Sequence, residues 1–179
     1  MLNDAEHQLV TAPLPSAHTL PPSAYTSAEV FDAERRQIFQ REWICVARED
    51  QIPNAGDYKS VDVVGQPLIV VRLEDRSVHA MSAVCTHRAM PVVNDCGNTA
   101  TFQCPYHLWK FRLNGELISA PHMDGVEPFQ ARSGLPSVRV EVWEGFVFVN
   151  LDPAAAALAP RLASLDDIVG GYCMRDMVT

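Results

Sequence analysis

The stretch CTHRAMPVVNDCGNTATFQCPYHLW, residues 85–109, contains two short motifs that each place one thiol close to one imidazole. In the first motif Cys85 and His87 are separated by one residue, and in the second Cys104 and His107 are separated by two. Prolines and a glycine accompany both motifs, at places where loops need a fixed or a permissive backbone. The pattern predicts two loops, each presented by strands, that close on one centre.

The four side chains are of the types that bind a soft or borderline metal. Two thiolates and two imidazoles form either a tetrahedral zinc site or an iron-sulfur centre in which His replaces Cys on one iron. Structural zinc motifs usually pair Cys with Cys and His with His, whereas here each motif is mixed. Mixed pairing favours a cluster with two chemically distinct ends, and a zinc-binding structural module remains the alternative.

The segments on both sides of these motifs are short runs of β-branched and aromatic residues separated by turn residues. Examples are PLIVVRL (67–73), VRVEVW (138–143) and FVFVNL (146–151). Such spacing predicts a mainly β fold, an antiparallel β-sandwich that carries a cluster-binding subdomain. Between two of the runs, Asn114-Gly115 predicts a hairpin with a type I′ turn, because both residues tolerate a positive φ.

The chain divides into four predicted segments. Residues 1–25 contain four prolines and no hydrophobic periodicity, which predicts an extended arm. Residues 26–42 have the apolar spacing of a helix that begins in a capping box at Thr26. The β domain is expected at 43–151, and residues 152–179 have Ala and Leu at helical spacing, which predicts a short helical tail.

Composition narrows the function classes. A chain of 179 residues with 47% hydrophobic content forms one core, and 14 basic against 22 acidic residues give a net charge of −8. Without a Lys/Arg cluster, nucleic acid and membrane surfaces are poor partners. No signal peptide and no apolar run of about 18 residues is present, so we expect a cytoplasmic protein. Five cysteines, an odd number, favour reduced thiols with a metal or redox role over a disulfide framework.

The two motifs and the segments around them resemble a known protein family. CTHRAMPVV and FQCPYHLWKF resemble the cluster-binding signature of Rieske proteins, in the variety found in ring-hydroxylating oxygenase alpha subunits, and the similarity extends over roughly residues 20–153. It implies a Rieske-type β-sandwich with one N-terminal and one short C-terminal helix. It also implies a 2Fe-2S cluster whose inner iron is bound by Cys85 and Cys104, and whose outer, more exposed iron is bound by His87 and His107.

Two differences from the family concern the loops. The family generally has Gly after the second His, and often after the His-Arg pair, whereas this chain has Leu108 and Ala89. Respiratory Rieske proteins have an additional Cys beside each ligand pair, but the neighbours here are Ala89, Met90 and Tyr106, so no disulfide joins the loops. We therefore expect a reduction potential in the lower part of the Rieske range of about −150 to +300 mV.

The resemblance implies an electron-transfer role. Such a domain accepts single electrons from a reductase or ferredoxin and passes them to a mononuclear non-haem iron, in a catalytic domain of a neighbouring subunit, within a homotrimer. No His follows His122, so the two-His-one-carboxylate iron site is missing from the chain as given. A complete alpha subunit is an oxidoreductase, a mono- or dioxygenase in aromatic ring hydroxylation. This chain alone is expected to transfer electrons only and has no catalytic residue; the alternative is a stand-alone Rieske-ferredoxin-type carrier.

Other residues have more ordinary interpretations. Trp109 either donates a hydrogen bond to a sulfide or carbonyl, or packs over the loop. We expect Cys45 to be a core residue, Cys96 a free thiol, and His79 a strand residue that is not a ligand. Residues 120–125 are either a third loop that shields the cluster or a surface turn.

Overall fold

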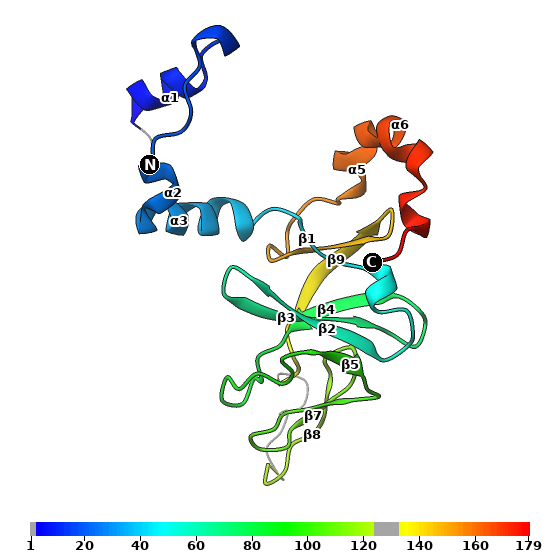
Figure 1. Ribbon diagram of the computed structural model, residues 1–179. Helices are drawn as coiled ribbons and strands as arrows, with labels where there is room; N and C mark the ends of the chain where they lie inside the picture. Colours follow the sequence, from blue (N-terminus) through cyan, green and yellow to red (C-terminus); the bar gives the residue numbers. More distant parts are fainter. Residues whose placement is uncertain (1–2, 124–132) are drawn as a thin grey trace. The chain divides into compact units, whose positions relative to one another are not determined.

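The computed structural model describes residues 3–123 and 133–179, and it divides the chain into two units, Met1–Arg41 and Glu42–Thr179 (Figure 1). The first unit consists of short helical elements. They are α1 (Asp4–Val10), η1 (Leu14–Ser16), α2 (Ser23–Thr26), α3 (Ala28–Glu34) and the π-helical turn η2 (Arg35–Phe39).

Capping explains where two of these helices begin. Helix α1 lies in the segment expected to be extended, and it starts with a capping box in which Asn3 and Glu6 each accept a hydrogen bond from the other's backbone N–H, both at 2.9 Å. Helix α3 is capped by Ser27, whose hydroxyl accepts from the N–H of Val30 at 3.3 Å. Thr26 is not the cap, because it ends α2 and its hydroxyl donates to the carbonyl of Pro22.

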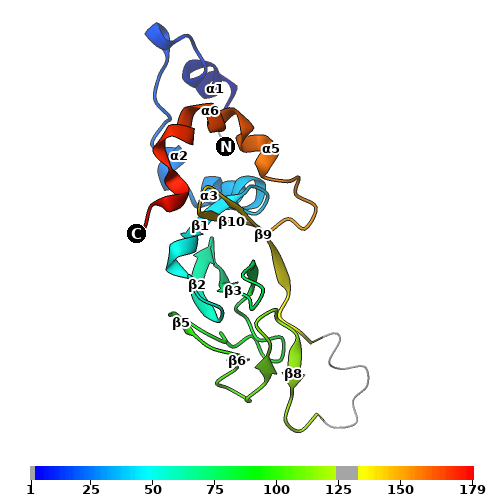
Figure 2. The ribbon, with the colours of Figure 1, turned by 90° about the vertical axis from the view of Figure 1, so that its right-hand side faces the viewer.

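The second unit contains two antiparallel sheets. The larger has seven strands in the order β1-β10-β9-β4-β3-β2-β5, and the smaller has three in the order β6-β7-β8. Figures 1 and 2 show the small sheet beyond the β2, β3 and β5 side of the large one. The strands are β1 (Ile44–Arg48), β2 (Asp57–Val63), β3 (Gln66–Arg72), β4 (Val78–Ser82), β5 (Cys96–Asn98), β6 (Phe102–Gln103), β7 (Lys110–Phe111), β8 (Leu117–Ser119), β9 (Ser137–Trp143) and β10 (Phe146–Asn150).

Strand β3 separates two hydrophobic clusters. Its residues Leu68 and Val70 belong to one cluster, and Ile69 and Val71 belong to the other. Successive side chains of a strand point to opposite faces, so a strand that is buried on both faces has an unbroken apolar run. The cluster that contains Ile69 and Val71 also contains both motif cysteines, so the two predicted thiol ligands are part of a hydrophobic core.

Two details of the β fold differ from expectation. The hairpin at Asn114-Gly115 is present, but of the pair only Gly115 has a positive φ, 86°, so the turn is not type I′. Strand β5 was not expected, because Cys96, Gly97 and Asn98 are exposed and show no alternation. Its register with β2 is supported by the Asn98 amide, which donates to the carboxylate of Asp57 at 2.8 Å.

After β10 the chain forms short helical turns and then contacts the large sheet again. These turns are α5 (Ala159–Leu162), η4 (Ala163–Leu165), α6 (Asp166–Val169), η5 (Gly170–Tyr172) and η6 (Met174–Asp176). A further turn, η3 (Glu49–Gln51), lies earlier in the chain, between β1 and β2. The Arg48 guanidinium donates to the carbonyls of Met174 and Met177 at 2.8 and 2.6 Å. Within residues 3–123 and 133–179, no helix combines the length and apolar character needed to cross a membrane.

Candidate metal centre

The first motif forms a hairpin-like loop directly after β4. The loop is closed by an isolated antiparallel bridge between Val84 and Pro91. Inside it, the N–H of Cys85 donates to the carbonyl of Met90 at 2.9 Å, and the N–H of Ala89 donates back to the carbonyl of Cys85 at 3.0 Å. These two backbone hydrogen bonds close the loop.

The second motif connects β6 to β7 and is closed in the same way. The N–H of Cys104 donates to the carbonyl of Trp109 at 2.8 Å, and the N–H of Leu108 donates to the carbonyl of Cys104 at 3.0 Å. In both loops the bonds therefore join the Cys to the fifth and fourth residues after it. The imidazole, by contrast, is two residues after the Cys in one loop and three after it in the other.

The fourth residue after each Cys has a left-handed backbone. Ala89 has φ of 54° and Leu108 has φ of 60°, a region in which a side chain costs about 1–2 kcal/mol relative to the right-handed conformation. These are the positions where the resembling family generally or often has Gly. The chain thus differs from the family in residue type, while the loops keep the conformation that Gly favours.

The four predicted ligands form two pairs. The thiols of Cys85 and Cys104 lie close enough to interact, and both residues are only 2% exposed. The rings of His87 and His107 are partly exposed neighbours, with centroids 4.5 Å apart and planes at 65°. The structure therefore brings all four residues to one place, with the sulfurs on the core side and the imidazoles on the surface side.

Electrostatics differ between the two ends. Burial raises the pKa of the Cys85 thiol, and the nearby Cys104 thiol raises it further, while the backbone N–H groups of His87 and Arg88 act in the opposite direction. Partial desolvation lowers the pKa of His107, and the positive charges of His87 and Arg88 add to this effect. The sulfur end is thus apolar with donors aimed at it, and the surroundings of His107 favour its neutral ring.

Two contacts around the predicted ligands involve partners that the sequence did not indicate. The indole of Trp109, 2% exposed, stacks on the ring of His87 with centroids 4.6 Å apart and planes at 6°. The hydroxyl of Thr86 donates to the carbonyl of Ser133 at 2.5 Å, which joins the first loop to the segment before β9. The sequence contains an aromatic residue and a hydroxyl at these places, but the partners lie in other segments of the chain.

The residues fit an iron-sulfur cluster of the mixed type. Nδ1 of His87 is buried and has no hydrogen-bond partner among the described residues, which is unusual unless the atom has another ligand. Separate thiol and imidazole pairs are the arrangement that a cluster with two chemically distinct irons requires.

The other cysteines lie outside the centre. Cys96 is an exposed free thiol in β5, and Cys173 is also free and exposed. Cys45 was expected in the core, but it is exposed on β1 next to an irregularity in the pairing with β10. His79 is half-buried in β4 with its Nε2 3.4 Å from the hydroxyl of Ser137. The expected loop at 120–125 lies partly outside the described residues.

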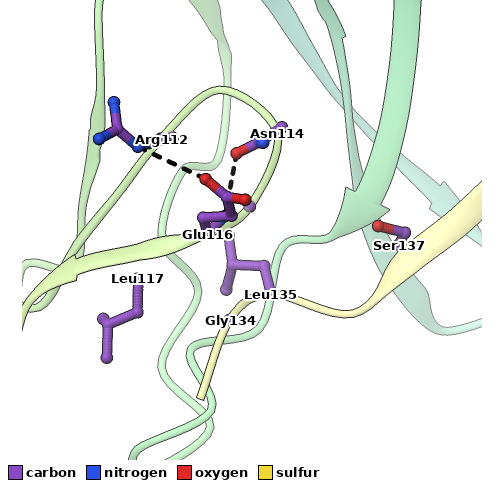
Figure 3. Close-up of a pocket in the computed structure, with 8 residues that line it drawn as sticks. Arg112, Asn114, Glu116, Leu117, Gly134, Leu135 and Ser137 are labelled. Atoms are coloured by element: carbon purple, nitrogen blue, oxygen red, sulfur yellow. Dashed lines mark hydrogen bonds and ion pairs between the residues drawn. The ribbon is translucent and has the colours of Figure 1, made fainter. Parts of the chain in front are cut away.

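A hollow of about 490 Å³ lies at the β7–β8 turn, away from the four predicted ligands (Figure 3). It is bordered by the turn on one side and by Gly134 and Leu135 on the other. Arg112 and Glu116 form an ion pair at 3.5 Å on its rim, and both side chains are exposed. None of the residues that line the hollow is a thiol or an imidazole, so it has no part in the metal centre.

Comparisons with known proteins agree with this geometry. The family described as Rieske [2Fe-2S] domain matches residues 42–130. The carnitine monooxygenase oxygenase subunit of Escherichia coli (strain K12) is 35% identical over 151 residues, which cover 83% of this chain and 40% of that protein. The glycine betaine monooxygenase oxygenase subunit of Chromohalobacter salexigens is 37% identical over 158 residues, covering 88% of this chain and 36% of that protein.

Solved structures show the same relationship. The quaternary ammonium Rieske monooxygenase CntA in complex with L-carnitine has a TM-score of 0.83 at 33% identity, over 89% of this chain and 47% of that one. A naphthalene 1,2-dioxygenase has a TM-score of 0.76 at 33% identity, over 81% of this chain and 34% of that one. The chain spans about 40% of the length of the curated relatives it matches. Residues 42–130 are therefore a Rieske domain, whose cofactor is a 2Fe-2S cluster, and the chain is related to the oxygenase subunits of Rieske oxygenases.

Proposed function

We propose that this chain is the electron-transfer part of a Rieske oxygenase, with Cys85 and Cys104 as ligands of the inner iron and His87 and His107 as ligands of the outer iron. The bound cluster takes up and releases one electron at a time. The observation that carries the proposal is the sorting of the four side chains, with two buried thiols at the core and two adjacent imidazoles at the surface.

Each residue pair has its own task in this proposal. The cysteines hold their iron where water is excluded, and the N–H groups of His87 and Arg88 directed at Cys85 stabilise negative charge on sulfur. His87 presents its buried Nδ1 as the ligand atom. Neutral imidazoles in place of two thiolates reduce the negative charge of the site, so an electron is accepted more readily than in an all-Cys site.

The surface beside the imidazoles is the proposed contact for redox partners. Met90, Tyr106 and Leu108 are 37%, 55% and 54% exposed, and the exposed Arg88 lies next to them. Exposed apolar groups next to a redox centre suit a transient contact, because they are desolvated at little cost when a partner arrives. The donor is a reductase or ferredoxin, and the acceptor is a mononuclear iron site in a catalytic domain.

The relatives support a proposal for the destination of the electron. Their names describe oxygenase subunits, and this chain corresponds to less than half of each. We propose that the acceptor iron belongs to a neighbouring subunit in a homotrimer. The names of the relatives include carnitine, glycine betaine and 2-aminobenzenesulfonate, and we infer that the domain they share with this chain does not select the substrate.

Spectroscopy of the loaded chain tests the ligand set. The expected sample is coloured, contains two irons and two sulfides, and gives after dithionite reduction an EPR signal with pulsed-EPR couplings to two histidine nitrogens. Replacing Cys85 or Cys104 with Ser removes the cluster, whereas Cys96→Ser, at an exposed thiol, leaves it intact.

The histidines need their own matched comparison. His87→Gln or His107→Gln removes one nitrogen coupling or the whole cluster, and His79→Gln, at another partly buried imidazole, retains both couplings. A colourless protein with stoichiometric zinc would contradict the proposal. So would a cluster that survives either Cys→Ser substitution.

A further inference from the structure

Trp109 makes a contact that joins the two ligand loops. Its indole stacks face to face on His87, with a centroid distance of 4.6 Å and an interplanar angle of 6°. Trp109 belongs to the second loop, and its carbonyl accepts the hydrogen bond from Cys104 that closes that loop. His87 belongs to the first loop. The aromatic face that contacts His87 is thus supplied by the loop that carries Cys104 and His107.

The two imidazoles have different neighbours. His107 contacts Tyr106 of its own loop, with centroids 3.7 Å apart and planes at 33°, and Tyr106 is 55% exposed. His87 lies against an indole that is 2% exposed and part of the hydrophobic core. A buried ring held by core packing restricts its neighbour much more than an exposed side chain does. One face of the His87 ring is therefore held by a buried aromatic residue, whereas the aromatic residue that His107 contacts in its own loop is exposed.

No covalent bond joins the loops. All five cysteines of the chain are free, so the clamp of respiratory Rieske proteins has no counterpart here. Apart from the shared cluster, the ring pair of Trp109 and His87 and the ring pair of His87 and His107 are the aromatic contacts between the two loops in the described residues.

We infer that Trp109 is a positioning residue for His87: it fixes the plane of the imidazole so that Nδ1 stays directed into the protein, and it holds the first loop against the second. This role rests on the proposed ligand set. Nδ1 of His87 is already buried without a partner, so the ring has its inward orientation before any cluster contact is counted. Parallel stacking restrains rotation of the imidazole out of that plane.

The test compares two substitutions at Trp109 in the loaded full chain. Trp109→Phe keeps an aromatic face and loses the indole N–H, whereas Trp109→Leu keeps an apolar side chain and loses the face. Phe111→Leu is the matched control, since Phe111 is a fully buried aromatic residue of the same core with no ring contact to His87. The measurements are histidine ¹⁵N pulsed EPR of the reduced cluster and the rate at which a chelator removes iron.

Trp109→Leu is expected to broaden or shift one of the two ¹⁵N couplings and to accelerate iron loss by up to about tenfold, the change that one stacked aromatic pair supports. Trp109→Phe and Phe111→Leu are expected to retain the wild-type couplings. Wild-type couplings and iron loss in Trp109→Leu would overturn the inference. If Trp109→Leu does not fold, Trp109→Phe decides: wild-type couplings support a role for the aromatic face, and a changed coupling overturns it.

The two proposals fail in different ways. A wild-type chain without two histidine couplings overturns the ligand set and the role of Trp109 together. A normal wild-type spectrum combined with unaltered couplings in Trp109→Leu overturns only the positioning role.

Discussion

Two glycines with nearly the same backbone angle offer a controlled test of the packing that supports the first ligand loop. Gly115 has φ of 86° and Gly65 has φ of 83°. A Cβ on Gly115 would lie 2.8 Å from the carbonyl oxygen of Leu135 and 3.2 Å from the sulfur of Met81, whereas a Cβ on Gly65 would have no atom within 4 Å. Substitution by Ala therefore introduces the same backbone strain at both sites, and at Gly115 it adds a steric clash.

The magnitudes follow from these contacts. The left-handed angle costs Ala about 1–2 kcal/mol, and the reduced freedom of the unfolded chain offsets about 0.4–1 kcal/mol, so Gly65→Ala should lower the free energy of unfolding by roughly 1 kcal/mol. In Gly115→Ala the backbone of Leu135 must also move. The hydrogen bond from Leu135 N–H to the Gly115 carbonyl, at 2.8 Å, and the packing of the 4% exposed Leu135 side chain are weakened. We expect an additional loss of about 2 kcal/mol.

Urea unfolding of the loaded protein measures both variants. The midpoint should fall slightly for Gly65→Ala and about three times as far for Gly115→Ala, with similar slopes. The hydroxyl of Thr86 donates to the carbonyl of Ser133, two residues before Leu135, so Gly115→Ala should also disturb the EPR spectrum. Equal midpoints for the two variants, or a strongly destabilised Gly115→Ala with an unchanged spectrum, would refute this account of how the segment supports the loop.

Four further predictions concern backbone, charge and redox properties. Ala89→Gly should raise the free energy of unfolding by up to about 1 kcal/mol and Ala89→Val should lower it, as measured by urea midpoints, because the angle of 54° suits Gly and disfavours a β-branched residue. Burial lowers the pKa of His79 in the folded chain below the ordinary value of 6.5, so the unfolded chain binds the proton more readily. The contribution of neutral His79 to the free energy of unfolding is then complete above about pH 6.5 and declines as the pH falls toward the folded pKa. His79→Gln should flatten this part of the plot of urea midpoint against pH, and an unchanged slope of that plot would count against the prediction. Arg72→Met should cost about 3 kcal/mol in thermal or urea unfolding, since the 8% exposed Arg72 binds the Glu49 carboxylate at 2.9 Å and also donates to the backbone carbonyls of Ile52 and Arg76. A dye-mediated titration should give a midpoint in the lower half of about −150 to +300 mV, and a value at the upper end would be incompatible with loops that lack a disulfide.

The fold class was predictable because most strands have a local signal. The runs at 67–73 and 138–143 are strands close to the expected bounds, and the apolar run of β3 matches burial on both faces. The short strand at Cys96–Asn98 was not predictable, because its stability comes from backbone pairing with β2 and not from its own side chains. Local propensity does not reveal such a partner.

The four candidate ligands were identifiable from residue type and spacing alone, and the structure brings all four together. The contacts around these four side chains were harder to predict from the sequence. The sequence left open whether Trp109 packs or donates, because its partner His87 belongs to another loop. The Gly preference of the family raised doubt about the loop at Leu108, but the left-handed angle is retained. The hydrogen bond that this angle permits, from Leu108 N–H to the Cys104 carbonyl, compensates part of the strain.

The common closure of the two loops separates the positions that hold the shape from those that hold the cofactor. Each loop is closed by two backbone–backbone hydrogen bonds, so the side chains at the intervening positions are not needed to keep the bend. Pro105 and Tyr106 are therefore sites where many residues should be compatible with cluster assembly. Combinatorial libraries at these sites offer a route to alter partner choice, or the recognition of an artificial electrode surface, while the scaffold and the four proposed ligands stay unchanged.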